Sequence, residues 1–195
     1  DPADWDAVME LESLTNPRLR DEVGDIQLVL PADRISGPGA GAIMAAFTHL
    51  NPAGSRFSDG AYGVFYTARE IETAIAETKH HRAAFMRATM QAAQELDMRV
   101  YAVDLNAQLH DLRGQQSALP EIYDLKDYSA GQALGRRLRS KGSHGIAYDS
   151  VRRAGGSCAA VFKPPVLSNC RQERHLCYVW DGKDIGLAYE KRELG

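Results

Sequence analysis

The chain has 195 residues, 44% apolar and 25% charged, a composition that fits one soluble domain with a sizeable core. Its 23 basic and 26 acidic residues give a net charge of −3, which argues against a general nucleic-acid-binding surface. No apolar run approaches the ~18 residues of a membrane span, and no signal peptide is visible, although the start at Asp1 leaves a preceding targeting segment open. The three cysteines are an odd number, so we expect reduced thiols and a cytoplasmic protein.

The first part of the chain is predicted to contain two helices and one strand. Apolar residues at helical spacing predict an amphipathic helix over residues 4–14. Residues 26–30 have the pattern of a strand that Pro31 ends. The glycine-rich segment 37–41 lacks the ending of a phosphate-binding loop, so we predict a turn that leads into a helix over residues 42–47.

The central stretch, residues 54–77, is predicted to form a loop, a short strand and the start of a long helix. Residues 63–66 are apolar and aromatic, which is typical of a buried strand. Thr67 and Glu70 have the spacing of a capping box, in which each side chain binds a free backbone amide at the beginning of a helix. We therefore predict a helix that begins after Thr67 and continues to about Leu96.

Helical periodicity assigns the faces of this long helix. At about 100° per residue, Glu77 and His81 fall with Glu70 on one flank, at the border between core and solvent, while His80 points away. The face toward the core is predicted to consist of Ile71, Ala74, Ile75, Thr78, Arg82, Phe85 and Thr89.

The second half of the chain reads mainly as strands. A tight turn at residues 181–184 predicts a hairpin. Ser129 is a candidate N-cap, and Gly142 a candidate stop, for one helix. The predicted elements are strands at 98–105, 145–148, 158–162, 175–180 and 185–189, a mostly irregular segment at 109–126 and a helix at 129–141.

Strands and helices do not alternate strictly along the chain, which favours the α+β class over a doubly wound sheet. We find no repeat or linker that would divide the sequence. We therefore expect one domain over residues 1–195, with an N-terminal helical extension at 1–25 and a core at 26–190.

Three side chains of the central stretch point to a site for an anionic ligand with a flat ring. Arg56 lies in a glycine-containing loop, Tyr66 ends a predicted strand, and Glu77 lies about two and a half turns into the predicted helix. A guanidinium group binds phosphate oxygens, and a carboxylate stabilises a developing positive charge. Structural roles are open alternatives: a loop salt bridge for Arg56, a core position for Tyr66, and an exposed pair with His81 for Glu77.

Other polar residues are weaker candidates. His49 and Asn51 precede Arg56 and either line the same cleft or form hydrogen bonds within the loop. Asn169 either contacts a ligand or occupies a turn. A further set matches no standard zinc spacing and has no apparent fourth ligand, so we expect no metal: Cys170, His175 and Cys177.

A later motif completes the pattern. Gly-Ile-Ala-Tyr-Asp-Ser at residues 145–150 supplies Ser150, which follows Arg56, Tyr66 and Glu77 in the chain. In this order and spacing, the residues resemble the RES-domain family, named for its Arg, Glu and Ser. The resemblance runs from about residue 34 to 189. Two features differ or stand out: Arg56-Phe-Ser replaces the Arg-Trp-Asn of many relatives, and the block from 168 to 189 is well developed.

The resemblance implies a fold and an activity. Family members are toxins of bacterial toxin–antitoxin pairs, with an ADP-ribosyltransferase-like fold whose small, mostly antiparallel sheets surround an NAD cleft. NAD would be the substrate, with Glu77, Arg56 and Tyr66 in catalysis. Arg56, Tyr66 and Ser150 would bind NAD, with His49 and Asn169 as further candidates. ADP-ribose would pass to a protein target or, alternatively, to water or phosphate.

The resemblance also implies a partner, an antitoxin with a helix-turn-helix DNA-binding module that covers the NAD cleft in a hetero-oligomer. Two rival classes remain as hypotheses. One is a module that binds NAD or a protein without turnover. The other is a toxin that acts on nucleic acid, which the acidic balance and the lack of a paired-carboxylate metal site disfavour.

Overall fold

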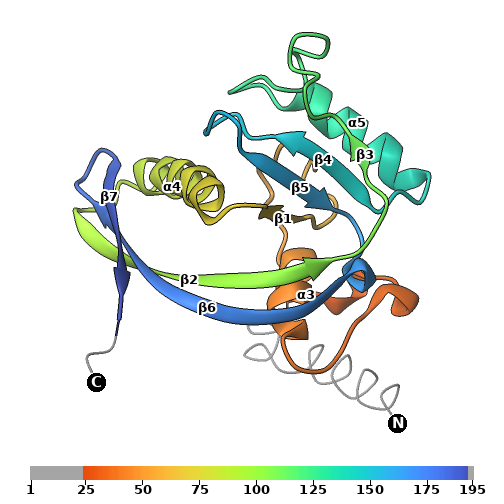
Figure 1. Ribbon diagram of the computed structural model, residues 1–195, viewed down its shortest axis with the longest axis horizontal. Coiled ribbons are helices and arrows are strands. Elements are labelled where there is room, and N and C mark those ends of the chain that lie inside the picture. Colours follow the sequence, from red (N-terminus) through yellow and green to blue (C-terminus); the bar gives the residue numbers. More distant parts are fainter. Residues whose placement is uncertain (1–23, 193–195) are drawn as a thin grey trace.

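The computed structural model describes residues 24–192, which form two small sheets and three α-helices (Figure 1). The first sheet has the strand order β1 (Phe65–Ala68), β5 (Ser157–Val161), β4 (Gly145–Asp149) and β3 (His110–Asp111). The second has the order β2 (Gln94–Leu105), β6 (Leu167–Trp180) and β7 (Ile185–Lys191). All pairs are antiparallel except β3–β4. The expected α+β class with small, mostly antiparallel sheets is confirmed.

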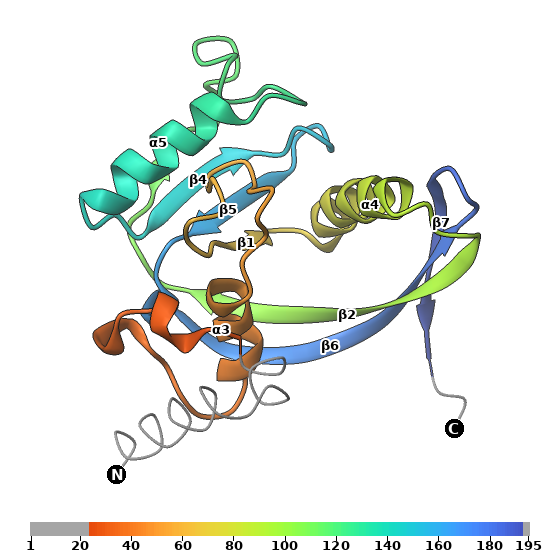
Figure 2. The ribbon, with the colours of Figure 1, turned by 180° about the vertical axis from the view of Figure 1, so that it is seen from behind.

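The three helices lie on different sides of these sheets (Figure 1, Figure 2). Helix α4 (Ile71–Ala88) lies along the concave side of the long, curved β2–β6 pair, and α5 (Ser129–Ser140) lies against the first sheet beside β4. Helix α3 (Ala40–Thr48) packs against β6 and β1. Short 3₁₀ turns are η1 (Ile26–Leu28), η2 (Pro31–Asp33) and η3 (Pro164–Val166). Among residues 24–192 we find no helix with the length and apolar character needed to cross a membrane.

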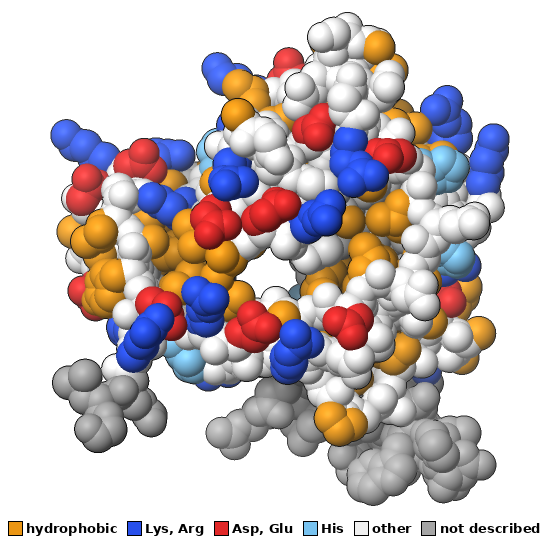
Figure 3. Space-filling model, in the orientation of Figure 1, with side chains coloured by type: hydrophobic (Ala, Val, Ile, Leu, Met, Phe, Trp, Pro, Cys, Tyr) orange, Lys and Arg blue, Asp and Glu red, His pale blue; other side chains and the backbone are white. Residues whose placement is uncertain are grey.

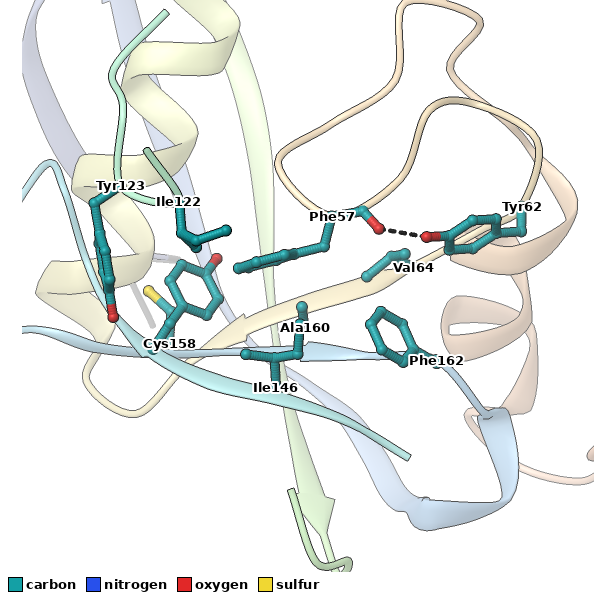
Figure 4. Close-up of a cluster of buried hydrophobic side chains, with 10 residues drawn as sticks. Phe57, Tyr62, Val64, Ile122, Tyr123, Ile146, Cys158, Ala160 and Phe162 are labelled. Atoms are coloured by element: carbon teal, nitrogen blue, oxygen red, sulfur yellow. Dashed lines mark hydrogen bonds between the residues drawn. The ribbon is translucent and has the colours of Figure 1, made fainter. Parts of the chain in front are cut away.

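The first sheet is buried on both faces, because successive side chains of a strand point in opposite directions. On one face, Cys158 and Ala160 of β5 pack with Phe57 in the cluster of Figure 4. On the other face, Ala159 and Val161 pack against the α3 side chains. Strand β5 therefore contributes to two apolar clusters, one on each face of the first sheet.

The second sheet binds α4 through a separate apolar cluster. Ala83 and Met86 of the helix contact Leu176, Tyr178 and Trp180 of β6. The tyrosine hydroxyl also lies 2.8 Å from the Thr78 hydroxyl. This packing holds α4 on the second sheet while its first turns approach the first sheet.

The predicted core face of α4 is confirmed only in part: Ile75 packs against the second-sheet cluster, but the most buried residues are different ones. The fully buried residues are Thr73, Ala83 and Met86, whereas Phe85 is 54% exposed. Periodicity alone favoured the larger Phe85 side chain. The orientation of the helix is instead set by its packing on the second sheet, where Ala83 and Met86 share an apolar cluster with side chains of β6.

The predicted capping box and the predicted helix length are also wrong. Thr67 pairs with Ala159 in the first sheet, and the helix begins at Ile71 with Glu70 as the N-cap residue. The helix ends at Ala88 instead of continuing to residue 96, because residues 94–105 form β2 and pair with β6. In both places long-range strand pairing overrides a local helical pattern.

Residues 26–30 do not form the predicted strand. They contain η1, where the Asp25 side chain accepts a hydrogen bond from the backbone amide of Gln27. The Val29 amide donates back to the Ile26 carbonyl, so the segment satisfies its own backbone groups without a neighbouring strand. The helix predicted at 4–14 lies outside the described residues, and the proposed domain boundary at 25/26 stays a prediction.

Several local predictions are confirmed. The helix predicted at 129–141 is α5, although its N-cap residue is Tyr128 and Ser129 is its first residue. Gly142 follows with a φ of +78°, in the left-handed region expected of a helix stop. The hairpin turn is also present, and the Asp181 carboxylate accepts hydrogen bonds from the amides of Lys183 and Asp184.

We predict that Gly135→Ala destabilises the fold. A Cβ atom at this α5 position would lie 2.1 Å from the Phe57 carbonyl oxygen, so helix or loop must move apart. The free energy of unfolding should fall by about 1–3 kcal/mol, the usual range for overpacking. Gly41→Ala in α3 is the matched control, because a Cβ there meets nothing within 4 Å. Urea unfolding of both variants checks the expectation, and equal stability of the two would contradict it.

Candidate active site

A cavity of about 350 Å³ lies where the loop containing Arg56, strand β1 and helix α4 meet. This volume is in the range of small-molecule sites. Arg56, Tyr66 and Glu77, predicted from different local elements, all line it. His81 and the rings of Tyr128 and Tyr148 line it as well.

Glu77 is held by Ser150, which follows β4 and is only 5% exposed. The Ser150 hydroxyl donates a hydrogen bond of 2.6 Å to Glu77 Oε1. Its oxygen accepts hydrogen bonds from the backbone amides of Arg152 and Arg153, at 3.1 and 3.0 Å. Because these amides fix the oxygen, the single hydroxyl proton is directed at the carboxylate. In this arrangement Ser150 orients Glu77.

Arg56 is a buried cation, 8% exposed, that is held by carbonyl oxygens. Its Nη1 donates to the carbonyls of Ile122 and Asp124, at 2.7 and 3.0 Å. Its guanidinium carbon lies 4.8 Å from the centre of the Tyr128 ring, within range of a cation–π contact. The salt bridge considered from the sequence is not formed with any carboxylate of residues 24–192. The positive charge is therefore buried without a neutralising anion.

Tyr66 presents its ring to the cavity while its hydroxyl is enclosed. The residue is 38% exposed, but the hydroxyl lies 2.8 Å from the Ser55 hydroxyl and accepts a hydrogen bond from the Phe57 amide. Burial of this oxygen raises the pKa of Tyr66 to about 12, against the smaller, lowering effect of the two hydrogen bonds. The phenol is therefore neutral at physiological pH, and the ring has a fixed position for stacking.

His81 lies one helical turn after Glu77 and also lines the cavity. Its pKa is lowered, chiefly because the surrounding protein shields the imidazole in part from water, and the Glu77 carboxylate opposes this shift. From the sequence, His81 was considered only as a pairing partner of Glu77. Because His81 lines the cavity, it is part of the candidate site.

Two residues predicted to bind the ligand do not line the cavity. The His49 ring lies at the end of α3, within 3.3 Å of the Thr48 hydroxyl and the Ala45 carbonyl. Asn169, on β6, donates a hydrogen bond to Asp104. Asn51 does line the cavity, and its side chain also makes the hydrogen bonds within the loop that the alternative reading expected. The positions of His49 and Asn169 give no support to their predicted ligand contacts.

Sequence reasoning did not single out Tyr128 and Tyr148. Tyr148 belongs to the strand of the 145–150 motif, in which every second residue faces the same side. Its position two residues after the apolar Ile146 was therefore an available signal that Tyr148 faces the interior. Tyr128 has no such signal in the sequence. Its contact in the site is with the guanidinium of Arg56, which lies 72 residues earlier in the chain.

A second cavity, of about 520 Å³, lies between the two sheets. Figure 3 shows an opening in this region with acidic and basic side chains around it. Arg113 and Asp111 form a 2.7 Å ion pair there, so these charges neutralise each other. The smaller cavity is the better candidate site because it holds a buried, unneutralised cation, an oriented carboxylate and aromatic rings, whereas Arg69 in the larger cavity is exposed. Within residues 24–192 no cluster of His, Cys, Asp or Glu is arranged to hold a metal ion.

The sequence matches the family model described as RES domain over residues 31–181. The chain belongs to the RES domain family. Its relative in Sinorhizobium fredii (strain NBRC 101917 / NGR234), named "Uncharacterized protein y4oC", is 30% identical over 199 residues, which is 97% of this chain and 78% of that protein. The Arg, Glu and Ser positions that suggested this RES domain from the sequence are Arg56, Glu77 and Ser150.

A chain of one solved structure is also similar to this RES domain. The crystal structure of the Mycobacterium tuberculosis MbcT–MbcA toxin–antitoxin complex contains a chain with a TM-score of 0.46 and 17% identity, over 67% of this chain and 74% of that chain. This likeness is too distant to carry a functional argument.

We predict that Ser150→Ala destabilises this RES domain. The substitution leaves two backbone amides without their acceptor and Glu77 without its donor. Loss of such buried partners costs about 1–3 kcal/mol of unfolding free energy. Ser157→Ala is the control, since the Ser157 hydroxyl makes no hydrogen bond within the described part of the chain; its effect should stay within about 0.5 kcal/mol. Chemical denaturation that gives both variants the same stability would contradict the orienting role of Ser150.

Proposed function

We propose that this RES domain is a toxin that cleaves the nicotinamide–ribose bond of NAD and transfers ADP-ribose to a protein, with release of nicotinamide. The observation that carries the proposal is the meeting of Arg56, Tyr66 and Glu77 in one cavity, with Ser150 bound to the carboxylate. Family membership adds the link to NAD and to toxin–antitoxin pairs.

Arg56 is suited to bind the pyrophosphate of the dinucleotide. It is buried and lacks an anionic partner among the residues of the structure, so a phosphate would supply the missing charge. Guanidinium groups form strong, charge-assisted hydrogen bonds with phosphate oxygens. Its contacts with two carbonyls and the Tyr128 ring would hold the group in place for the ligand.

Tyr66 is suited to bind the nicotinamide ring. Its hydroxyl is anchored, its ring borders the cavity, and its raised pKa keeps the phenol neutral. Aromatic rings bind flat or cationic groups through their faces. The nicotinamide of NAD is a positively charged ring before cleavage, so this contact would favour the substrate in its reactive form.

Glu77 is suited to stabilise the transition state. Cleavage of the bond to ribose develops positive charge on the sugar, as in glycoside hydrolysis. Nicotinamide leaves as a neutral ring from a cationic one, so no general acid is required. The oriented carboxylate would lie near the growing charge and bind the ribose hydroxyls, an effect that often contributes several kcal/mol to catalysis.

Two parts of the proposal rest on family membership alone. One is an antitoxin partner, with a helix-turn-helix DNA-binding module, that covers the NAD cleft. The other is action in the bacterial cytoplasm. Two alternatives remain. The acceptor of ADP-ribose would be water or phosphate in the first, and the chain would bind NAD without turnover in the second.

We predict that the purified chain moves label from NAD, labelled on its adenylate phosphate, to a protein in a bacterial lysate. Glu77→Gln should reduce this transfer about 10²–10³-fold, because the amide can still accept the Ser150 hydrogen bond but carries no charge. Glu72→Gln is the matched control: it removes an exposed carboxylate in the first turn of the same helix and should leave transfer unchanged.

Each alternative has its own result. Label recovered only in small molecules would establish hydrolysis or phosphorolysis in place of protein modification. Label retained in NAD by the unmutated chain would reject the enzyme and favour a binding module.

A further inference from the structure

Helix α4 presents two titratable side chains to the cavity. Ala74, Glu77, Thr78 and His81 line it, and their spacing places them on one face of the helix. Glu77 is half-buried and is bound to the buried Ser150, whereas His81 is exposed. The carboxylate therefore lies toward the interior of the site and the imidazole toward solvent.

The His81 ring has nitrogens available for a ligand. Neither makes a hydrogen bond to any residue in the described range 24–192, and the adjacent His80 ring lies edge-on, with ring centres 5.4 Å apart. The charged or titratable groups around it are Glu77 and His80 on α4, Arg56 from the preceding loop and Arg152 from the turn after β4.

These neighbours favour a neutral imidazole. Shielding from water has the largest effect and lowers the pKa of His81, and the two arginines act in the same direction. Glu77 acts in the opposite direction with a smaller effect than shielding. A neutral imidazole can accept a proton at physiological pH.

Glu77 is poorly placed to accept that proton itself. One of its oxygens already receives the Ser150 hydrogen bond. More importantly, its negative charge is needed while positive charge develops on the ribose, and protonation would remove it at that moment. Separate residues for charge stabilisation and proton acceptance resolve this conflict, as in other sites that contain two titratable groups.

We propose that His81 is the general base of this site and that the acceptor is a hydroxyl group, of water or of a protein side chain. The inference rests on the proposed function. The acceptor oxygen forms a bond to C1′ of the ribose as the C1′–nitrogen bond breaks. The electron pair of that bond leaves with nicotinamide, and the acceptor proton moves to a ring nitrogen of His81, which later releases it to solvent.

Hydroxyl acceptors and phosphate differ in whether they need a general base. A phosphate dianion already carries an anionic oxygen and needs no base. A hydroxyl group must lose a proton during the transfer, and a positioned base accelerates such steps about 10²–10⁴-fold. Dependence on His81 therefore distinguishes an acceptor that must lose a proton from phosphate.

The test measures nicotinamide release from NAD by the full chain in a bacterial lysate dialysed free of phosphate, between pH 5 and 8. The rate of nicotinamide release with the Glu77→Gln variant is taken as the background. The variants are His81→Gln and, as the matched control, His80→Gln, since His80 does not line the cavity. For the unmutated chain the rate should rise with pH as His81 loses its proton and then level off.

His81→Gln should be about a hundredfold slower, with an unchanged KM for NAD and no rise with pH, while His80→Gln should behave like the unmutated chain. Imidazole added to His81→Ala should restore part of the rate. Release by His81→Gln within twofold of the unmutated rate would overturn this inference and leave the proposed function standing. Release that requires added phosphate would overturn this inference and also protein as the acceptor. No release by the unmutated chain, with or without added phosphate, would overturn both.

Discussion

The hydrogen bond from Ser150 to Glu77 joins the two halves of the structure. Helix α4, which carries Glu77, packs on the second sheet, whereas Ser150 follows β4 of the first. A second contact, from the Arg153 guanidinium to the Thr73 hydroxyl, reinforces the same junction. The candidate site lies at this junction, so the distance between its cation and its carboxylate depends on how the sheets are held together.

The site combines features that are costly for stability but useful for binding. Arg56 is buried with carbonyl partners and an aromatic ring but no carboxylate in the described part of the protein. A buried charge without a counter-ion is normally disfavoured in a folded protein. Departures of this kind from the rules of stability are expected where a ligand completes the site. The oriented carboxylate of Glu77 and the neutral rings nearby fit the same interpretation.

The two cavities share part of one wall. Thr67, Ala68 and Cys158 line both, so the edge of the first sheet is only one layer thick between them. Burial raises the pKa of Cys158 to about 12, which keeps its thiol protonated and unreactive. This residue thus acts as a small apolar part of the wall, within the strand predicted at 158–162.

The sequence by itself determined the α+β class, helix α5, the hairpin at 181–184 and the set of Arg56, Tyr66, Glu77 and Ser150. These features depend on composition, short motifs and a family pattern that neighbouring residues carry. The tertiary structure alone decided the rest: Thr67 joins β1, residues 94–97 join β2, and α4 turns Met86 toward the core in place of Phe85. It also decided that Tyr128 stacks on Arg56 and that His81 lines the cavity. The reason is physical: strand pairing and packing between segments far apart in the chain outweigh local propensity, and no local pattern encodes them.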